Sequence, residues 1–220
     1  MSNVDALVDA LPRLGDGIRV TLLLTGGGAA CGLIVAVTLG LASGNDRLMV
    51  RGAARVFIEF FRGTSLLVQL FWLVFVLPQF GVTFEPLTCG IIALALNYGA
   101  YGAEVVRGSI SAVPKGQWDV TTALNMSRIQ RMARIVFPQA WALMIPSLTN
   151  LLIQLLKGTA LATFILLQDL NYMIGQLQRS TGDTVFAFSV GLTIYFALAW
   201  LLTQVMHMLE ARAKHRMGLA

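Results

Sequence analysis

Long, nearly uncharged apolar segments restrict the possible folds of this chain more than any other feature of its sequence. A helix needs about 20 apolar residues to cross the hydrocarbon core of a bilayer, and several segments approach or exceed that length. They lie at residues 18–41, 57–80, 87–106, 140–156 and 185–208. Only 12% of the 220 residues are charged. The sequence therefore predicts an all-α membrane protein with about five transmembrane helices.

These segments divide the chain into a membrane domain with a short extension at each end. We expect residues 1–16 to be an external N-terminal segment, residues 17–209 to form the membrane domain and residues 210–220 to be a cytoplasmic tail. The segment 140–156 is the shortest of the apolar segments. Whether the region 157–184 after it forms a re-entrant segment is left open, since only protein or a cavity could shelter such a turn.

Basic residues gather on one side of the predicted membrane. Most Lys and Arg residues fall in the regions 47–55, 107–134 and 212–216, whereas the loop 78–86 has Glu85 and no basic residue. Because cytoplasmic loops are enriched in Lys and Arg, we expect the N-terminus outside and the C-terminus in the cytoplasm. This topology explains the net charge of +5 better than nucleic-acid binding does, and no nucleic-acid motif is present.

A stripe of small residues follows one face of the first apolar segment. It recurs at every fourth position and consists of Gly28, Gly32, Ala36, Gly40 and Gly44. At helical spacing such a stripe lets another helix approach closely. We therefore expect this face to be a packing surface.

The sequence lacks the motifs that catalysis or cofactor binding would require. There is no G-x-x-x-x-G-K-[ST] phosphate loop, and no cluster of His, Cys, Asp and Glu has the spacing of a metal site. We therefore expect no catalytic residue, no metal site and no cofactor bound by this chain.

The longest polar stretch, residues 107–139, is too polar to span a membrane. Apolar residues recur along it among arginines, which predicts one or two short amphipathic helices that lie along the membrane surface. Ser127 is expected to cap a second helix that begins near Arg128. Pro138 is expected to mark the entry into the next span.

Part of this stretch resembles the cytoplasmic coupling loop of ATP-binding cassette (ABC) importer permeases, called the EAA loop. The pattern of that loop is Glu-Ala-Ala, three residues, Gly, nine residues and Ile-x-Leu-Pro. This chain keeps the spacing, with Asp119, Val120, Thr121, Asn125, Ile135, Phe137 and Pro138 at the corresponding positions. Asn125 replaces the glycine, which weakens the case for a glycine-specific backbone conformation there.

Further segments resemble signatures of the polar amino-acid permeases of the same type I family. They are residues 59–69, residues 101–108 with 113–117, residues 137–140 and residues 157–161. The last reads Lys-Gly-Thr-Ala-Leu, where the family usually has Lys-Asp-Thr-Ser-Leu. Within the family, Asn125 and the run 70–81 are most similar to permeases for ectoine and hydroxyectoine.

The resemblance implies a division of labour among several subunits in a bacterial cytoplasmic (inner) membrane. The expected partners are a second permease subunit, identical or different, an ATPase dimer that binds ATP and Mg²⁺, and an extracytoplasmic solute-binding protein. The loop would dock into the ATPase through a helix laid in a groove; the alternative is a helix that rests on lipid headgroups. The residues expected to carry this coupling are Asp119, Val120, Thr121, Leu124, Asn125, Met126, Ser127 and Arg128.

Charged and polar residues within or near the spans are candidates for a solute pathway or gate. Glu59 lies three residues before Arg62, as Glu104 lies three before Arg107, so each pair predicts either a local ion pair or a gate contact. The deeper polar residues predict either hydrogen bonds between helices or contacts with a small zwitterion such as ectoine or a polar amino acid. The candidates are Glu59, Arg62, Gln69, Asn97, Tyr98, Tyr101, Glu104, Asn150 and Gln154.

Two other classes of function remain compatible with a helical membrane protein. One is a secondary transporter or channel subunit driven by an ion gradient, for which Glu104 would be the candidate coupling residue. The other is a scaffold subunit of a membrane enzyme complex. The sequence shows no internal duplication of the kind that many secondary transporters contain.

Overall fold

The computed structural model describes residues 3–216, and this part of the chain contains helices and no strand. The expectation of an all-α protein is therefore confirmed. In chain order the elements are α1 (Asn3–Ser43), α2 (Leu48–Gly63), α3 (Leu66–Phe71), η1 (Trp72–Val76), η2 (Leu77–Phe80), α4 (Pro86–Ser111), α5 (Lys115–Ala123), α6 (Arg128–Arg131), η3 (Met132–Val136), α7 (Phe137–Gly158), η4 (Thr159–Ile165), α8 (Leu170–Thr181) and α9 (Thr184–Arg216).

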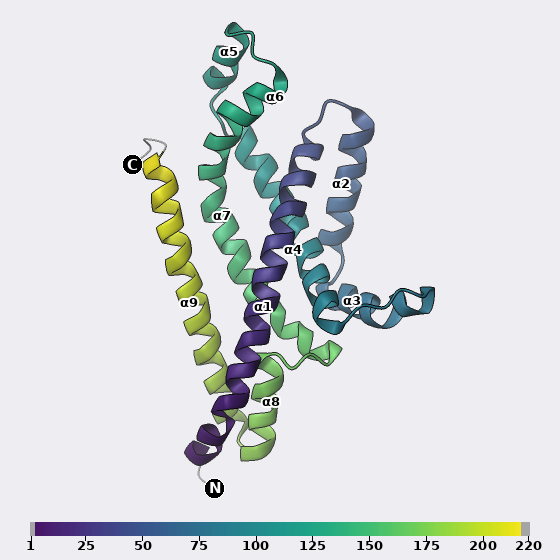
Figure 1. Cartoon of the computed structure of the whole chain (residues 1–220), viewed down its shortest axis with the longest axis vertical. Helices are drawn as coiled ribbons and strands as arrows, with labels where there is room; N and C mark the ends of the chain where they lie inside the picture. Colours follow the sequence, from purple (N-terminus) through teal and green to yellow (C-terminus); the bar gives the residue numbers. More distant parts are fainter. Residues whose placement is uncertain (1–2, 217–220) are drawn as a thin grey trace.

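Within residues 3–216, four long helical segments run along the length of the molecule. They contain α1, α4, α7 and α9, and each is long and apolar enough to cross a membrane (Figure 1). The α5–α6 region lies at one end, together with the C-terminal end of α9 (Figure 1). The N-terminus and α8 lie at the other end. The three regions rich in Lys and Arg thus gather at the α5–α6 end, as the positive-inside pattern requires.

Helices α1 and α4 pack closely along the stripe of small residues. A Cβ atom on Gly28 would lie 3.0 Å from Leu94, one on Gly32 would lie 3.4 Å from the Ala95 carbonyl oxygen, and one on Gly40 would lie 2.7 Å from Val106. The expected close approach of another helix is therefore confirmed, and the helix is α4. Without Cβ atoms on these glycines the two backbones come within van der Waals distance of each other.

We predict that Gly40→Val destabilises the protein, because its Cβ has no space between Val106 and the Ala103 carbonyl oxygen. Overpacking of this kind costs about 1–3 kcal/mol. Gly26→Val is the matched control on the same helix, since nothing lies within 4 Å of its Cβ position. Thermal unfolding in detergent measures the effect. Equal midpoints for the two variants would contradict this packing.

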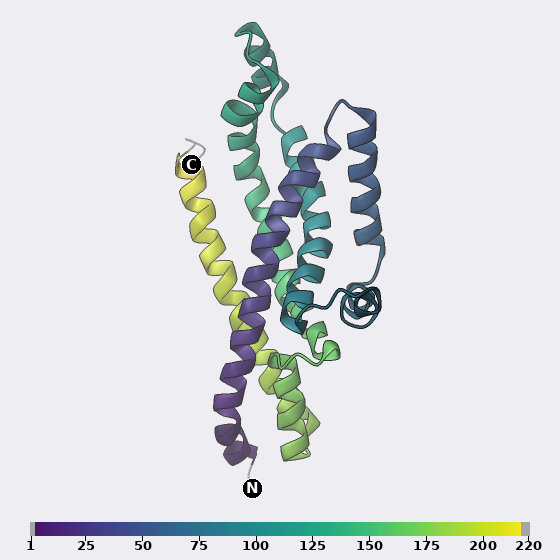
Figure 2. The same cartoon turned by 45° about the vertical axis from the view of Figure 1, so that its right-hand side comes forward.

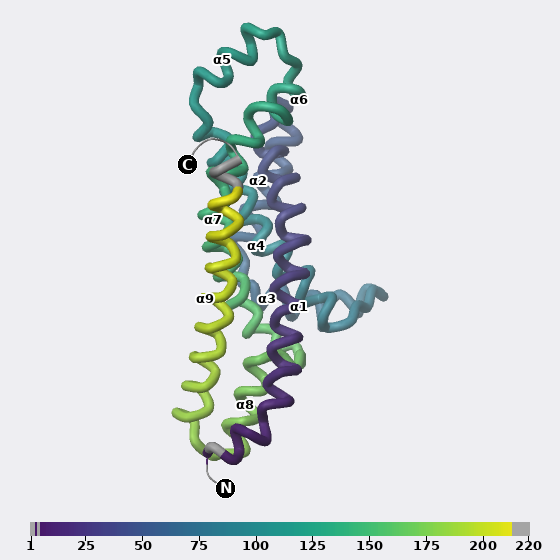
Figure 3. The backbone as a smooth tube through the Cα atoms, turned by 60° about the vertical axis from the view of Figure 1, so that its left-hand side comes forward, coloured from purple at the N-terminus to yellow at the C-terminus, as the bar shows by residue number. Residues whose placement is uncertain are grey.

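The apolar segment predicted as a span over residues 57–80 is bent in the structure. Helix α2 starts earlier, at Leu48, and ends at Gly63, and the chain then bends by 100° into the arm formed by α3, η1 and η2. Thr64 and Ser65 are extended at the bend. The arm projects from the side of the bundle in Figure 3, and Figure 2 views it nearly end-on. A hydropathy pattern records the length of an apolar segment and not the direction of the chain. The two helices were therefore predicted as one segment.

The N-terminal segment 1–16 is not separate from the first span where the structure describes it. Residues 3–16 belong to α1, which continues through Pro12 to Ser43. Leu14 is buried against Leu170, Met173 and Ile174 of α8. This packing explains why the helix extends beyond the apolar segment 18–41.

The region 157–184 turns back on itself after α7. Helix α7 is followed directly by the short 3₁₀ helix η4. Leu166 then adopts a left-handed conformation with φ of 62°, and α8 begins at Leu170. Helix α8 then packs on α1 and α9 near the N-terminal end of the molecule (Figure 1).

Candidate functional site: a coupling surface and a polar helix face

The turn between α5 and α6 has the backbone geometry that a glycine usually provides. Asn125 has a φ of 49°, the left-handed conformation that Asn tolerates better than other residues with side chains. The Met126 N–H donates to the Thr121 carbonyl, and the Asn125 N–H donates to the Thr122 carbonyl. These bonds form a Schellman motif. The replacement of the glycine by Asn125 weakened the case for a glycine-like conformation, yet the backbone adopts that conformation and asparagine supplies it.

The helix after the turn begins as the sequence predicts. The Ser127 hydroxyl accepts a hydrogen bond from the Gln130 N–H at 3.3 Å, and the Gln130 side chain accepts one from the Ser127 N–H at 3.1 Å. This is a complete capping box. The prediction that Ser127 caps a helix starting at Arg128 is confirmed, and Pro138 lies in the first turn of α7 as expected.

The predicted coupling residues surround an apolar surface at the end of the molecule. Val120 is 56% exposed and Leu124 is 67% exposed, whereas Thr121 is buried and donates to the Trp118 carbonyl. Asp119, Asn125, Ser127 and Arg128 are exposed, and Met126 is half-buried. Two neighbouring apolar side chains of α5 thus face outward with no covering element among residues 3–216.

The segment that contains α5 and α6 packs against the long helices. Trp118 and Val113 pack in a cluster with Val106 of α4 and Val136 and Met144 farther along the chain. The Arg131 guanidinium lies 5.4 Å from the centre of the Trp118 ring. Packed side chains therefore connect α5 to α4 and α7.

Gln69 and Asn97 hold the bend between α2 and α3. The Gln69 Nε2 donates to the Thr64 hydroxyl at 2.7 Å and to the Phe61 carbonyl at 3.0 Å. The Asn97 Nδ2 donates to the same Phe61 carbonyl at 3.1 Å and to the Gln69 Oε1 at 3.3 Å. These amides satisfy a carbonyl that the end of α2 leaves without a helical partner. Both residues therefore lie in hydrogen bonds between helices.

Both acid–base pairs form the local ion pairs that the spacing predicts. Arg62 bonds to Glu59 at 3.2 Å, and Arg107 bonds to Glu104 at 2.6 Å. The Arg62 guanidinium also lies 5.3 Å from the centre of the Tyr101 ring, and the Tyr101 hydroxyl donates to the Arg62 carbonyl at 3.3 Å. The first pair thus connects α2 to α4.

One face of α7 carries an exposed polar stripe along a membrane-spanning helix. Ser147, Asn150, Gln154 and Lys157 are all exposed, and their spacing of three or four residues places them on the same side of the helix. Asn150 and Gln154 are among the predicted pathway residues; Ser147 and Lys157 are not. The signal was present in the sequence, because Lys157 lies three residues after Gln154 on the face that Gln154 shares with Asn150.

Tyr98 borders this stripe and fits against Gly158. The Tyr98 hydroxyl donates to the Gln154 carbonyl at 2.9 Å. A Cβ atom on Gly158 would lie 2.5 Å from the same hydroxyl. The absence of a side chain at Gly158, where the family usually has aspartate, leaves the space that Tyr98 occupies.

A buried carboxylate beyond the C-terminal end of α7, between η4 and α8, was missed by the sequence predictions. Asp169 is fully buried and caps α8, accepting from the Tyr172 N–H at 3.0 Å and from the Thr163 hydroxyl at 2.5 Å. The Leu170 N–H donates to the Thr21 hydroxyl of α1 at 3.1 Å. Burial raises the pKa of Asp169 above its ordinary value, and the two hydrogen bonds it accepts oppose part of that rise.

We predict that Asp169→Ala lowers the free energy of unfolding by about 2 kcal/mol, because it removes a helix cap. Asp169→Asn keeps an acceptor for the Tyr172 N–H and should lose far less. An acid with a raised pKa in the folded protein stabilises it most at low pH, and this contribution declines as the pH rises through the folded pKa. Thermal unfolding at a series of pH values should therefore show that the stability of Asp169→Asn, relative to that of the natural protein, increases as the pH rises. A pH-independent difference would contradict the prediction.

The residues that the structure describes show no cluster suited to a metal. Among residues 3–216, no group of three or more His, Cys, Asp and Glu side chains comes together. The arrangement instead offers an exposed apolar surface, a bent helix pair and a polar helix face.

The arrangement of these features agrees with comparisons of the chain with known proteins. Residues 36–215 match the family described as the binding-protein-dependent transport system inner membrane component. This chain belongs to that family. It is therefore a membrane permease component, and the general resemblance found from the EAA-like loop is confirmed.

Several relatives cover nearly the whole permease. It is 40% identical to the probable amino-acid ABC transporter permease protein y4tF of Sinorhizobium fredii, over 92% of this chain and 88% of the relative. It is 36% identical to the L-cystine transport system permease protein TcyB of Bacillus subtilis, over 91% of this chain and 86% of the relative.

Solved structures support the same fold. The permease superimposes on a chain of an amino acid ABC transporter crystallised with histidines, with a TM-score of 0.85 and 30% identity, over 94% of this chain and 96% of the other. It also superimposes on a chain of the inward-facing MetNI methionine ABC transporter with a TM-score of 0.76 at 16% identity, over 92% of this chain and 97% of the other.

Proposed function

We propose that this chain is the membrane-spanning permease subunit of an ATP-driven importer for a small zwitterionic solute, an amino acid or an ectoine-type compound. It works in a bacterial inner membrane with a second permease subunit, an ATPase dimer and an extracytoplasmic binding protein. The single observation that carries the proposal is the exposed polar stripe of α7 beside Tyr98.

Polar side chains on a spanning helix are costly against lipid. Such residues almost always face a bundle interior or a water-filled cavity. The stripe from Ser147 to Lys157 is exposed in the isolated chain, so it is best accommodated against a second permease subunit, with a solute passage between the two. The relatives named above as amino-acid and L-cystine permeases support the solute class.

The chemistry of this face suits a zwitterion. The Lys157 ammonium provides a donor for a carboxylate, and the amides of Asn150 and Gln154 offer both donors and acceptors. The ring of Tyr98 lies on the neighbouring helix α4 beside the stripe and offers an aromatic face to a cationic centre, whereas the Tyr101 ring already contacts the Arg62 guanidinium. Polar amino acids and ectoine-type solutes both carry these two charges.

The α5 surface supports ATP coupling by a separate subunit. Val120 and Leu124 are exposed next to each other on one short helix, which is the arrangement of an amphipathic helix that docks into a groove. ATP and Mg²⁺ would be bound by the partner. For an ion-driven transporter, Glu104 would have to carry coupling, yet it forms a charge-assisted bond of 2.6 Å to Arg107.

The test is the ATPase activity of the assembled complex in lipid, with its binding protein and a panel of solutes. Stimulation by amino acids alone supports an amino-acid importer, and stimulation by ectoine and hydroxyectoine alone supports the narrower solute class. Absence of stimulation by any zwitterion, in a complex whose subunits copurify, would reject the proposal.

A further inference from the structure

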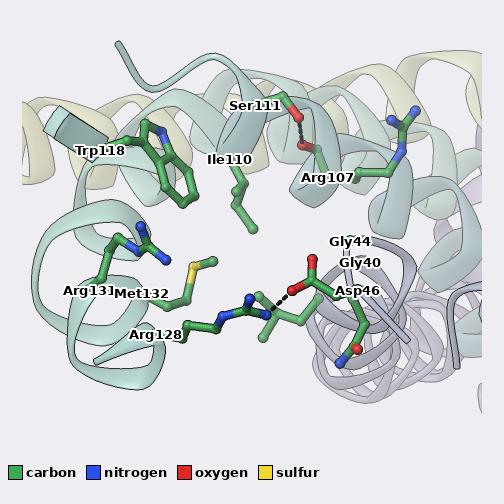
Figure 4. Close-up of a pocket in the computed structure, with 12 residues that line it drawn as sticks. Gly40, Gly44, Asp46, Arg107, Ile110, Ser111, Trp118, Arg128, Arg131 and Met132 are labelled. Carbon is green, nitrogen blue, oxygen red and sulfur yellow. Dashed lines mark hydrogen bonds and ion pairs between the residues drawn. The ribbon is translucent and has the colours of Figure 1, made fainter. Parts of the chain in front are cut away.

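A basic hollow lies at the α5–α6 end of the long helices (Figure 4). It has a volume of about 510 Å³, within the range of about 300–1,000 Å³ typical of ligand pockets. It lies between the C-terminal ends of α1 and α4, the α1–α2 turn, α5 and the α6–η3 segment. Its lining comprises Gly40, Leu41, Gly44, Asn45, Asp46, Arg107, Ile110, Ser111, Trp118, Arg128, Arg131 and Met132.

The charge of this hollow favours an anion. Arg107, Arg128 and Arg131 line it, whereas Asp46 is its one acidic lining residue. Asp46 pairs with Arg128, and Arg107 is held by Glu104 outside the lining. Arg131 lies against the Trp118 ring (Figure 4) and pairs with no carboxylate in the described part of the chain. Because an arginine has five N–H donors, the pairing of Arg128 with Asp46 leaves donors for a second acceptor.

The basic hollow continues into an apolar groove between α1 and the η3–α7 segment. A second hollow of about 580 Å³ shares Leu41, Asn45, Arg128 and Met132 with the first. The rest of its lining is apolar and consists of Val37, Ile129, Ala133 and Phe137. Arg128 thus stands at the border between a charged compartment and an apolar one.

The apolar surface extends farther along the molecule. Phe137 stacks on Trp141, with ring centres 6.2 Å apart. Trp141 in turn lines a third hollow of about 300 Å³, which is bounded mainly by α1, α4 and α7. Apolar side chains therefore continue from the groove toward the middle of the spans, although the second and third hollows share no lining residue.

We propose that this hollow and groove together bind one anionic phospholipid, with its phosphate between Arg128 and Arg131 and an acyl chain along α1 and α7. Arginines bind phosphate oxygens through charge-assisted hydrogen bonds. Basic pockets between spanning helices suit anionic headgroups, and Trp118 has the amphipathic ring typical of the membrane interface. A free phosphate or a nucleotide would use the basic hollow and leave the apolar groove empty. The proposal requires only that the chain spans a membrane, so it does not depend on which solute is transported.

The test uses the assembled transporter, purified in detergent and titrated with phosphatidylglycerol, with bound lipid counted by native mass spectrometry. We expect the double variant Arg128→Ala/Arg131→Ala to weaken phosphatidylglycerol binding about tenfold or more. Arg134→Ala is the matched control, because Arg134 is an exposed arginine of the same segment that does not line the hollow. Equal binding by the double variant and the control would overturn the proposal.

Two further variants separate charge from structure and lipid from free phosphate. Asp46→Asn breaks the ion pair with Arg128 and also removes a negative charge from the hollow, so we expect it to strengthen phosphatidylglycerol binding. Weaker binding would mean that the double arginine variant acts through the lost ion pair, and it would overturn the proposal. Ala133→Phe fills the groove from an exposed position and should weaken lipid binding severalfold. If Ala133→Phe has no effect and inorganic phosphate competes with the lipid, the site binds free phosphate and the lipid proposal fails.

Discussion

Replacing Leu124 with glutamate is expected to uncouple ATP hydrolysis from transport. Leu124 is 67% exposed at the C-terminal end of α5, next to Val120. If this surface docks into a groove of the ATPase, the substitution puts a carboxylate into an apolar contact, where an unpaired charge is strongly unfavourable. A central interface contact contributes about 2 kcal/mol or more, so ATP-driven uptake of the solute should fall by at least about tenfold.

Uptake and ATPase activity must be measured together on the same reconstituted complex to detect uncoupling. Thr122→Glu serves as the control, because Thr122 is also exposed on α5 but lies on a different face of the helix from Leu124. We expect the control to transport normally. Unchanged uptake with fully coupled ATPase activity in Leu124→Glu would reject the docking role and favour a helix that rests on lipid headgroups.

Replacing Lys157 with methionine is expected to reduce uptake by about tenfold or more. Lys157 is exposed at the end of the polar stripe on α7, and a charge-assisted bond to a solute carboxylate contributes about 1.5–3 kcal/mol. Methionine keeps much of the length of the side chain and removes the charge. Lys157→Arg keeps the charge and should recover part of the uptake.

The control for Lys157 is a basic residue that lies outside the stripe. Arg179 is exposed on α8, so Arg179→Met removes one positive charge without changing the face of α7. Copurification of the ATPase with each variant tests assembly. If Lys157→Met and Arg179→Met transport equally well, Lys157 does not contact the solute and the polar stripe has another role.

The spans and the caps were predictable because their signals are local. Apolar length located the helices that became α1, α4, α7 and α9, and the small-residue stripe predicted which face of α1 another helix would approach closely. The Ser127 cap followed from its position before a helical pattern. Each of these features depends on residues within a few turns of one another, which a single sequence displays directly.

The bend and the buried carboxylate were not predictable because they depend on distant residues. The direction of the chain after Gly63 is fixed partly by Asn97, which donates to the Phe61 carbonyl from α4. The start of α8 is tied to Thr21, a residue 149 positions away from Leu170. The local pattern also did not reveal that Asn125 would adopt the left-handed backbone conformation that a glycine would provide.

The candidate pathway residues separate by environment in the structure. Gln69 and Asn97 are buried in hydrogen bonds that hold the bend, whereas Asn150 and Gln154 are exposed along α7. All four were predicted to be pathway candidates because they are polar residues within predicted spans. Only burial distinguishes an amide that joins two helices from an amide that is free to meet a solute or a second subunit.

The most direct test of an ATP-driven permease is solute uptake into proteoliposomes, measured with and without the partner ATPase and in the presence of a protonophore. Uptake that requires both the ATPase and ATP, and that survives the protonophore, is the predicted result. Uptake that persists without the ATPase and collapses with the protonophore would identify an ion-driven transporter and contradict the central claim.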